Sequence, residues 1–406
     1  MNTIVFNQDR TRMPSFNELK TKSTVLVTCP KGLSGYLKHE LESHTLPIIG
    51  EYSSGVSVRA SFNDCMRLNL TLSHAHHVLF MLKESRCATP DEMYHAVISI
   101  DWENIIPNNG YVCVTSVVHT PSINDSRYAN LKCKDAIVDK LVKKTGRRCD
   151  SGSERSKTVV FLYWVDDRCC IYLDTSGEPL SKRGYRAIPG TAPMQETLAA
   201  AVVATALTNN PPVIINPMCG SGTLAIEAAL KICNKAPGLT RSNFGFMHCM
   251  AYDVEEYMKI RRTLEAAVKR KPEIRIIATD INPDVVAAAR HNAKAAEMDG
   301  VIEFGICDFR ETPIPESNGV ILLNPEYGYR LGEVEKLQSV YRSIGDFFKQ
   351  DCKGYIGYVF TGNFDLAKFI GLKARRKYPF LSGKIECRLY EYELYAGSKA
   401  TGAKKE

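Results

Sequence analysis

The fold is decided by one stretch, Val213-Ile214-Ile215-Asn216-Pro217-Met218-Cys219-Gly220-Ser221-Gly222-Thr223, in which an apolar run ends in a glycine-rich turn. The run is typical of a buried strand, and the apolar spacing of residues 224–234 predicts a helix directly after the turn. Gly220 and Gly222 let the backbone turn sharply and come close to a ligand. The free N–H groups of the helix would point back at the turn, where they could hold a carboxylate or a phosphate. The third glycine of the dinucleotide fingerprint is absent, so the turn alone could also be purely structural.

The next predicted strand covers residues 274–280 and ends in Asp280. In open α/β sheets, ligands bind at the carboxyl ends of the strands. The Asp280 carboxylate can accept hydrogen bonds from both ribose hydroxyls of a nucleoside cofactor. The alternative is an acid that only stabilises the start of the following helix, which Asn282 can cap and Pro283 can open.

A third predicted strand, residues 301–307, is followed by Asp308 and Phe309. An acid at this place can accept a hydrogen bond from the adenine amine of such a cofactor, while Phe309 or Ile281 covers the ring. A simple loop acid is the alternative interpretation of Asp308.

The fourth predicted strand, residues 319–323, leads into Asn324-Pro325-Glu326-Tyr327-Gly328. As a local pattern this pentapeptide is a turn signal. Because it follows the fourth strand of the series, its polar groups are expected to converge with the glycine turn, Asp280 and Asp308 at one edge of the sheet.

The first half of the chain alternates short strands and helices, which predicts α+β modules in front of the α/β domain. Residues 1–22 are polar and predicted to be a loose tail, 23–70 form a small module, and 71–178 form a second one. In the second module, residues 131–141 predict a helix whose polar side carries Lys132, Lys134, Lys140, Lys143 and Lys144. This basic face could bind a polyanion or could simply be solvated.

Composition places the chain among globular proteins: of 406 residues, 44% are hydrophobic and 24% charged. The formal net charge of +7 suits a polyanionic partner without requiring one. Fourteen cysteines include no C-x-x-C pair, so no metal is expected, and a reducing cytoplasm is the natural location. No run is long enough for a membrane span, and we expect no membrane partner.

Several motifs together resemble a known family. The K-x-K-D-A-I-V-D helix at 132–139, set between strands, looks like part of the THUMP domain of RNA-modifying enzymes. Residues 181–186 and 192–200 resemble the junction at which such proteins enter their methyltransferase domain. With the glycine turn and the 324–328 loop, the chain resembles, over roughly Thr24 to Ala396, the bacterial THUMP-containing guanine-N2 methyltransferases of large-subunit ribosomal RNA.

The resemblance implies the fold, the cofactor and the partner. The fold would be a class I (Rossmann-like) α/β methyltransferase domain over 185–397, preceded by ferredoxin-like and THUMP α+β modules. The α/β domain would end in an antiparallel hairpin. The cofactor would be S-adenosyl-L-methionine, and the partner RNA, ribosomal RNA above all, held by the THUMP module and by basic loops such as 373–384. A solvated hairpin is the alternative interpretation of residues 373–384. The residues expected at the cofactor are Pro193, Asn216, Pro217, Cys219, Gly220, Gly222, Thr223, Asp280, Ile281, Asp308, Phe309 and Asn324.

The predicted reaction is methylation of an exocyclic amine, for which Asn324, Pro325 and Tyr327 are the catalytic candidates. The lone pair of such an amine is delocalised into the purine ring. Asn324 Oδ1 and the Pro325 carbonyl could accept its two hydrogens and direct the lone pair at the methyl group, while Tyr327 stacks on the base. The family pattern is N-P-P-Y/F, whereas this chain has Glu326 in third place. That carboxylate could accept a proton, alter the substrate or weaken activity.

The leading hypothesis is therefore formation of N2-methylguanosine in 23S ribosomal RNA. The alternatives are an amino-methyltransferase that acts on transfer RNA or on another base, and a non-catalytic RNA-binding factor. A nucleotide-dependent oxidoreductase is a weaker rival, because no acid–base pair that would handle a nicotinamide is evident. The sequence leaves the oligomeric state open.

Overall fold

The chain forms two compact units in this computed structural model, and each is described by itself. The structure describes residues 21–186, 188, 194–328 and 334–395. The first unit comprises Met1–Arg183 with Ala236–Ala267, and the second comprises Gly184–Lys235 with Val268–Glu406. Within the described ranges, no helix is long and apolar enough to cross a membrane.

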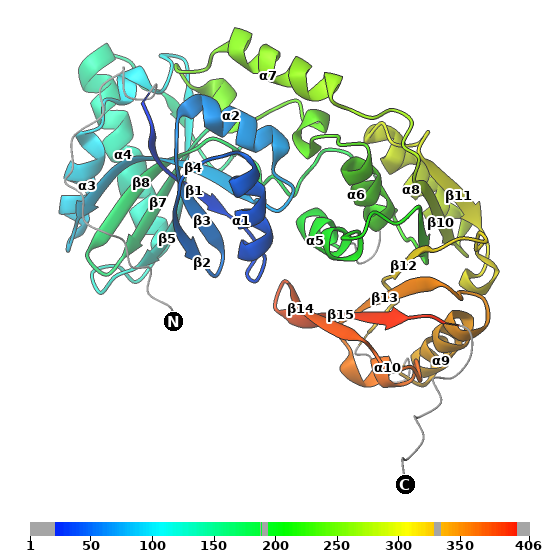
Figure 1. Ribbon diagram of the computed structural model, residues 1–406. Helices are drawn as coiled ribbons and strands as arrows, with labels where there is room; N and C mark the ends of the chain where they lie inside the picture. Colours follow the sequence, from blue (N-terminus) through cyan, green and yellow to red (C-terminus); the bar gives the residue numbers. More distant parts are fainter. Residues whose placement is uncertain (1–20, 187, 189–193, 329–333, 396–406) are drawn as a thin grey trace. The chain divides into compact units, whose positions relative to one another are not determined.

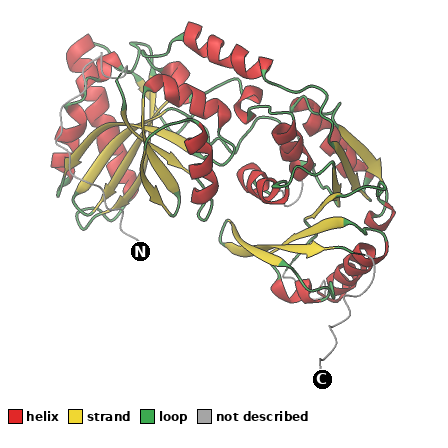
Figure 2. Cartoon of the chain, in the orientation of Figure 1, coloured by secondary structure: helices red, strands yellow, loops and turns green. Residues whose placement is uncertain are grey.

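The first unit is built on one eight-stranded sheet, with strand order β2-β3-β1-β4-β8-β7-β5-β6 (Figures 1 and 2). Its strands are β1 (Ser23–Thr28), β2 (Ile48–Tyr52), β3 (Gly55–Ala60), β4 (His77–Arg86), β5 (Tyr111–His119), β6 (Asp150–Ser151), β7 (Thr158–Val165) and β8 (Arg168–Asp174). Its helices are α1 (Ser34–Ser43), α2 (Phe62–Thr71), α3 (Pro90–Ile98), α4 (Ser126–Thr145) and α7 (Val254–Ala266), with short 3-10 turns η1 (Trp102–Asn104), η2 (Pro237–Thr240) and η3 (Gly245–His248).

Strand β4 joins the two predicted front modules into a single sheet. It pairs antiparallel with β1 on one side, where Phe80 lies opposite Val25, and with β8 on the other, where Phe80 lies opposite Leu173. Phe80 is 2% exposed, and its ring packs edge-on against Phe62 of α2, with ring centroids 6.1 Å apart. Strand β4 was not predicted from the sequence. The two modules that were expected to be separate are joined through it by backbone hydrogen bonds into one sheet.

A segment within the predicted methyltransferase range packs in the first unit. Residues 236–267 follow the glycine turn and its helix in sequence, yet Gly238 lies so close to α2 that a Cβ there would be 2.5 Å from Leu70 Cα. Arg241, 8% exposed, donates hydrogen bonds to the carbonyls of Pro179 (2.8 Å) and Glu178 (3.1 Å). These contacts tie the segment to the residues that follow β8. The extent of the methyltransferase domain, residues 185–397, stays a prediction. Its residues 236–267 belong by their contacts to the first unit.

The second unit contains a seven-stranded sheet with order β11-β10-β9-β12-β13-β15-β14. Strands β9 to β13 are parallel to one another, and β15 runs antiparallel to both of its neighbours. The strands are β9 (Val213–Pro217), β10 (Arg275–Asp280), β11 (Ile302–Ile306), β12 (Gly319–Leu323), β13 (Tyr355–Thr361), β14 (Arg376–Ser382) and β15 (Ile385–Glu393). The helices are α5 (Glu196–Ala206), α6 (Thr223–Ile232), α8 (Pro283–Ala295), α9 (Val334–Gln350) and α10 (Phe364–Lys368), with η4 at Phe309–Glu311. This is the parallel α/β arrangement with a closing hairpin that the sequence predicts.

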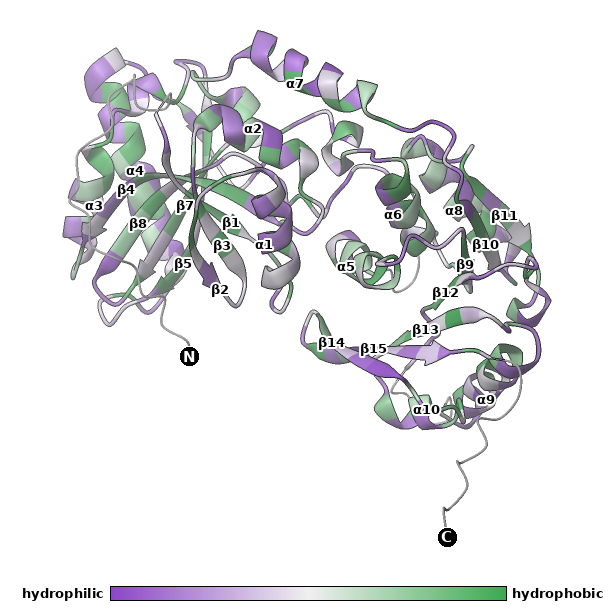
Figure 3. Ribbon diagram, in the orientation of Figure 1, coloured by the Kyte–Doolittle hydropathy of each residue, from purple (hydrophilic) through white to green (hydrophobic). Residues whose placement is uncertain are grey.

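Of the two interpretations of the basic segment 373–384, a loop and a hairpin, the structure has the hairpin. Residues Arg376–Ser382 form β14 and pair with β15 along its length. Figure 3 shows this hairpin as largely hydrophilic. A strand at the edge of a sheet needs few apolar residues, because one backbone edge and much of its surface face solvent, so its pattern resembled that of a loop.

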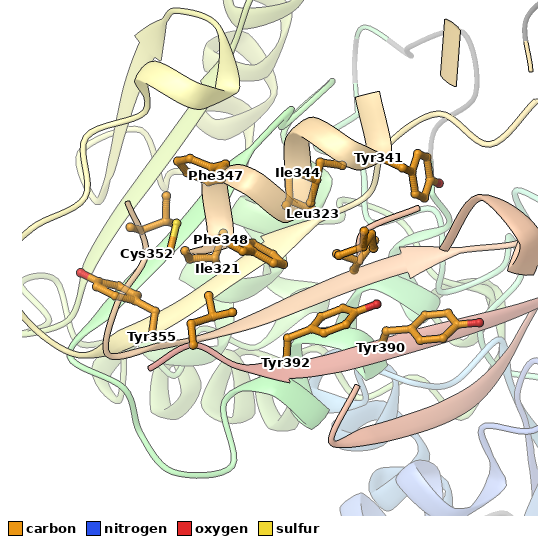
Figure 4. Packing of buried hydrophobic residues seen from close by; sticks show 14 of the residues in the cluster. Ile321, Leu323, Tyr341, Ile344, Phe347, Phe348, Cys352, Tyr355, Tyr390 and Tyr392 are labelled. Carbon is orange, nitrogen blue, oxygen red and sulfur yellow. The ribbon is translucent and has the colours of Figure 1, made fainter. Parts of the chain in front are cut away.

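The core of the second unit lies between α9 and the sheet, as Figure 4 shows. Tyr341, Ile344 and Phe348 of α9 pack with Ile321 and Leu323 of β12. All five are at most 1% exposed. This packing fixes the end of β12, from which the candidate catalytic loop emerges.

Candidate active site

The site lies where the strand order of the second sheet reverses, between β9 and β12. These two parallel strands pair at two positions, Val320 with Ile214 and Ile321 with Ile215. From β9 the sheet continues to β10 and β11 on one side and to β12 and β13 on the other. A crevice is expected at the carboxyl ends of the strands at such a switch point. All five residues of β9 are buried, so its tip is held firmly in the sheet.

The glycine turn after β9 has the backbone conformation that its sequence predicts. Gly220 has φ 56° and Gly222 has φ 84°, both in the left-handed region that favours glycine. A Cβ on Gly222 would lie 3.1 Å from Cβ of Ala289, so this glycine also permits close packing of α6 against α8. A Cβ on Gly220 would meet no atom within 4 Å, so Gly220 borders open space. The turn therefore offers room for a ligand at Gly220 and not at Gly222.

Asp280 lies at the tip of β10 and contacts the glycine turn directly. Its Oδ2 accepts a hydrogen bond from Gly220 N at 3.0 Å, and its Oδ1 accepts one from Asn282 N at 3.1 Å. Each carboxylate oxygen has two lone pairs, so both oxygens can accept a further bond from a ribose hydroxyl. The carboxylate thus shapes the turn and remains able to bind a ligand. Asn282 caps α8 as predicted, accepting from Asp284 N at 2.9 Å.

Asp308 already has a strong partner within its own turn. Arg310 donates to both of its oxygens, with Nε at 2.8 Å from Oδ1 and Nη2 at 2.9 Å from Oδ2. Hydrogen bonds from Arg310 lower the pKa of Asp308, so this carboxyl is ionised at neutral pH and acts as an acceptor only. The assignment of Asp308 to the adenine amine stays a prediction, and it would have Asp308 share its lone pairs with Arg310.

The apolar side chains near the strand tips differ in exposure. Ile281 is 67% exposed and Ile306, at the tip of β11, is 59% exposed, so both are available to cover an adenine ring. Phe309 is half-buried instead, packed edge-on against Phe347 with ring centroids 5.8 Å apart. Ile306 was missed by the sequence analysis because a single apolar residue at the end of a strand gives no signal of its own.

Two asparagines at the switch point have buried acceptors that are unpaired among the described residues. Asn216 Nδ2 donates to the Leu322 carbonyl at 2.8 Å and so links β9 to β12, while its Oδ1 has no hydrogen-bond partner. Asn324 Oδ1 is likewise buried without a partner. A buried polar atom left unpaired costs free energy, and such atoms are rare unless a ligand satisfies them. Asn324 Oδ1 is the acceptor that the sequence analysis assigned to the substrate amine.

A side chain of α9 holds the loop after β12 in place. Tyr341 Oη donates to the Glu326 carbonyl at 3.4 Å and is 2.8 Å from Thr361 Oγ1. Pro325 is buried and Glu326 is exposed, so the residue that departs from the family pattern points its carboxylate into solvent. The Tyr327 ring lies against the backbone of Gly362, where a Cβ would come within 3.0 Å of Tyr Cε2. Tyr327 also makes side-chain contact with Cys387 of β15.

The remaining predicted residues occupy the turn or its surroundings. Pro217 is the buried last residue of β9. Cys219 is 8% exposed, and burial raises the pKa of its thiol to about 12, so it stays protonated. Thr223 opens α6, and its hydroxyl accepts a hydrogen bond from Arg186 Nη2 at 3.0 Å. Pro193 lies outside the described residues.

Arg186 is a further residue that the sequence analysis missed, having quoted it only as part of the junction motif. Besides Thr223, its Nη2 donates to the Met194 carbonyl at 2.6 Å, and its Nε lies 3.3 Å from Glu196 Oε1. The two charged side chains are 17% and 8% exposed. This buried ion pair connects the start of α5 to the start of α6, immediately behind the glycine turn. Among the residues placed in the structure, no group of histidines, cysteines or acids could hold a metal ion.

Comparisons with known proteins agree with this architecture. Three family models match in succession: the RlmL ferredoxin-like domain at residues 24–79, the THUMP domain at 87–174, and the RMKL-like methyltransferase domain at 183–391. The predicted fold class and the family resemblance are thereby confirmed.

Relatives and solved structures match almost the whole chain. The ribosomal RNA large subunit methyltransferase K/L of Syntrophotalea carbinolica is 35% identical over 379 residues, which cover 90% of this chain and 53% of the relative. The chain thus spans about half the length of the curated relatives of this name that it matches. The solved structure of SMU.472, whose description names a methyltransferase complexed with SAH, has a TM-score of 0.82 at 25% identity and covers 94% of this chain and all of that one. The crystal structure of a predicted N6-adenine-specific DNA methylase from Listeria monocytogenes has a TM-score of 0.82 at 26% identity. The match covers 94% of this chain and 98% of that one.

Proposed function

The chain belongs to the RMKL-like methyltransferase family, and from that premise we propose that it is an S-adenosylmethionine-dependent RNA methyltransferase that forms N2-methylguanosine in 23S ribosomal RNA. The single observation that carries the proposal is the buried, unpaired Oδ1 of Asn324 at the tip of β12. An acceptor without a partner at this place suits an amine that brings its own hydrogens. The relatives named as large-subunit ribosomal RNA methyltransferases and the THUMP match support RNA as the substrate.

The residues at the strand tips fit the proposed cofactor. Asp280 has acceptor capacity left for ribose hydroxyls, and Gly220 borders open space beside it. Ile281 and Ile306 present exposed apolar surface for an adenine ring. When bound there, S-adenosylmethionine supplies a methyl group on a positively charged sulfur. The SAH in the description of the SMU.472 structure supports this choice of cofactor.

In the proposed mechanism, the chain acts by orienting the target amine. Asn324 Oδ1 accepts one hydrogen of the guanine N2 amine, and the carbonyl of Pro325 accepts the other. Both bonds draw the hydrogens away from the ring plane and leave the nitrogen lone pair directed at the methyl group. Tyr341 holds the loop by its hydrogen bond to the Glu326 carbonyl at 3.4 Å.

The test is methyl transfer by an Asn324→Ala variant. Wild-type protein incubated with unmodified ribosomal RNA and isotopically labelled S-adenosylmethionine should label the RNA. Asn324→Ala should reduce the rate by roughly 100- to 1,000-fold, as loss of one positioned polar group does at other active sites. Its affinity for the cofactor, measured by calorimetry, should stay within a few fold.

Asn318→Ala is the matched control. Asn318 is exposed and precedes the first residue of β12, whereas Asn324 follows the last one. It should transfer methyl groups like the wild type. Near-normal turnover in Asn324→Ala would remove the assigned role of this side chain.

A second candidate is methylation of the amine of another base, which the described specificity of the Listeria structure favours. The same pair of acceptors can hold an adenine N6 amine. The two functions differ in the nucleoside that carries the label.

A further inference from the structure

We propose that a second nucleotide of the RNA, adjacent to the one that is methylated, binds in an open hollow beside the catalytic loop; this rests on the proposed function. The hollow has a volume of about 470 Å³ and is lined by residues 362–365 and 384–386. This volume lies within the range of about 300–1,000 Å³ that ligand sites have. Its walls are the turn after β13 with the start of α10, and Lys384 with the first two residues of β15.

The hollow borders the catalytic loop without being part of it. None of residues 324–328 lines it. Gly362 lies next to both: a Cβ on this residue would be 3.0 Å from Tyr327 Cε2 and 2.9 Å from Ile385 Cγ2, so the Tyr327 and Ile385 side chains approach the same side of Gly362. A base held against Tyr327 would therefore lie beside the hollow, which Ile385 lines. Enzymes that extrude a base also contact the nucleotides that flank it.

Phe364 gives the hollow a surface on which a base can stack. The guanidinium carbon of Arg388 lies 4.1 Å from the centre of the Phe364 ring, and Arg388 does not line the hollow. Arg388 thus covers one face of the Phe364 ring, and the half-buried ring also lines the hollow. Aromatic rings at the surface are the usual partners of single-stranded bases. Ile385, 39% exposed, adds apolar surface beside the ring.

The charged groups around the ring also suit a nucleotide. Lys384 is exposed at the rim and can contact a phosphate. Asp365 also lines the hollow, but it is paired with Lys368 at 2.7 Å. The Glu386 carboxylate can accept a hydrogen bond from an amino group on a base edge. A planar apolar group between one cation and one carboxylate matches a nucleotide whose base carries an amine, which adenine, cytosine and guanine do and uracil does not.

The experiment uses the full chain and unmodified 23S ribosomal RNA transcribed in vitro. Phe364→Ala should raise the KM for RNA by about 5- to 150-fold, the loss expected for one base–aromatic stack. Its kcat and its affinity for S-adenosylmethionine should be unchanged, because the contact is made equally in the ground and transition states. Lys384→Ala should raise the KM less and reduce the salt dependence of binding by about one phosphate contact. Lys384 is exposed, so its removal leaves the fold intact.

Two matched controls separate the hollow from general effects. Phe304→Ala removes an aromatic ring that also lies under an arginine, Arg290, at 5.3 Å, on β11. Lys353→Ala removes an exposed lysine at the amino end of β13, away from the strand tips. Both should keep the wild-type KM for RNA.

Ultraviolet crosslinking of the wild-type chain to the same RNA provides an independent readout. Mass spectrometry should find a nucleotide attached to a peptide that contains Phe364 or Lys384. An unchanged KM in both variants together with no crosslink in either segment would overturn the proposal. Crosslinking needs RNA binding and not methyl transfer, so a chain that crosslinks at Phe364 without labelling RNA would refute the proposed function and leave the hollow as an RNA site.

Discussion

Asp280 has one role that the structure shows and one that stays a prediction. Its carboxylate holds the glycine turn through Gly220 N, which is a structural role. The predicted role, from its place at the end of a strand, is to bind a ligand with its remaining lone pairs. The two roles are compatible, because each carboxylate oxygen can accept more than one hydrogen bond.

We expect Asp280→Ala to weaken S-adenosylmethionine binding. Hydrogen bonds to a charged group contribute about 1.5–3 kcal/mol, so the dissociation constant should rise by roughly 10- to 150-fold. Isothermal calorimetry measures this directly. Asp299→Ala, at an exposed acid of the same unit, is the control and should bind like the wild type. Unchanged affinity in Asp280→Ala, with a melting temperature close to that of the wild type, would mean that the carboxylate serves the turn alone.

At single residues, the sequence supports a proposal where chemistry and position coincide. Asn324, Asp280 and Gly220 could be proposed because each follows a recognisable strand and carries a group suited to its task. Arg186 could not be proposed in this way. Its partners Glu196 and Thr223 lie in two different helices, and only the folded chain shows that the three side chains meet.

At the scale of elements, the Arg186–Glu196 pair joins α5 to α6 behind the glycine turn. Both side chains are largely buried, and removing one member of a buried ion pair is strongly destabilising. Arg186→Met should therefore lower the free energy of unfolding of the second unit by about 3–5 kcal/mol. The Arg186→Met/Glu196→Met double variant should recover most of that loss.

The measurement is hydrogen exchange of α6 and β9 amides under increasing urea. Both tryptophans, Trp102 and Trp164, belong to the first unit, so their fluorescence does not report on this change. Arg275→Met is the control, since Arg275 and Glu303 form an exposed pair that should contribute at most about 1 kcal/mol. Equal losses of unfolding free energy in Arg186→Met and Arg275→Met would show that the buried pair contributes no more than the exposed one.

Elements themselves were predictable to differing degrees. The apolar run of β12 gave its bounds correctly, because a strand buried on both faces differs sharply from its flanks. For strand β14 at the sheet edge, the sequence left a loop and a hairpin as alternatives. Strand β4, central and apolar, was not recognised between two helical patterns. Local periodicity describes the burial of a segment, and pairing with strands far away in sequence is a separate property that it does not contain.

For the whole molecule, the domain plan follows the family and the contacts add detail to it. The ferredoxin-like and THUMP matches meet at β4, which pairs with strands of both. Residues 236–267 lie within the methyltransferase match and yet pack in the first unit. The chain therefore passes between the two units at three points, near residues 183, 236 and 267. Nothing in the local pattern of this segment could have indicated where it packs.

The sequence gives the net charge of +7 but does not show which basic side chains form ion pairs. On α4, Lys132 pairs with Asp91 at 2.6 Å and Lys140 with Asp101 at 3.1 Å. Much of the basic face predicted to meet RNA is thus neutralised within the first unit. Any RNA contact through this helix would have to compete with these pairs or use its neighbouring groups.

The central claim is that this chain transfers a methyl group to guanine N2 in ribosomal RNA, and nucleoside mass spectrometry tests it most directly. The purified chain would be incubated with unmodified 23S ribosomal RNA and S-adenosylmethionine labelled in its methyl group, and the RNA then digested to nucleosides. We expect the label in N2-methylguanosine, and its absence from a parallel reaction with Asn324→Ala. Label in a methyladenosine, or no label from a chain that still binds the cofactor, would contradict the claim.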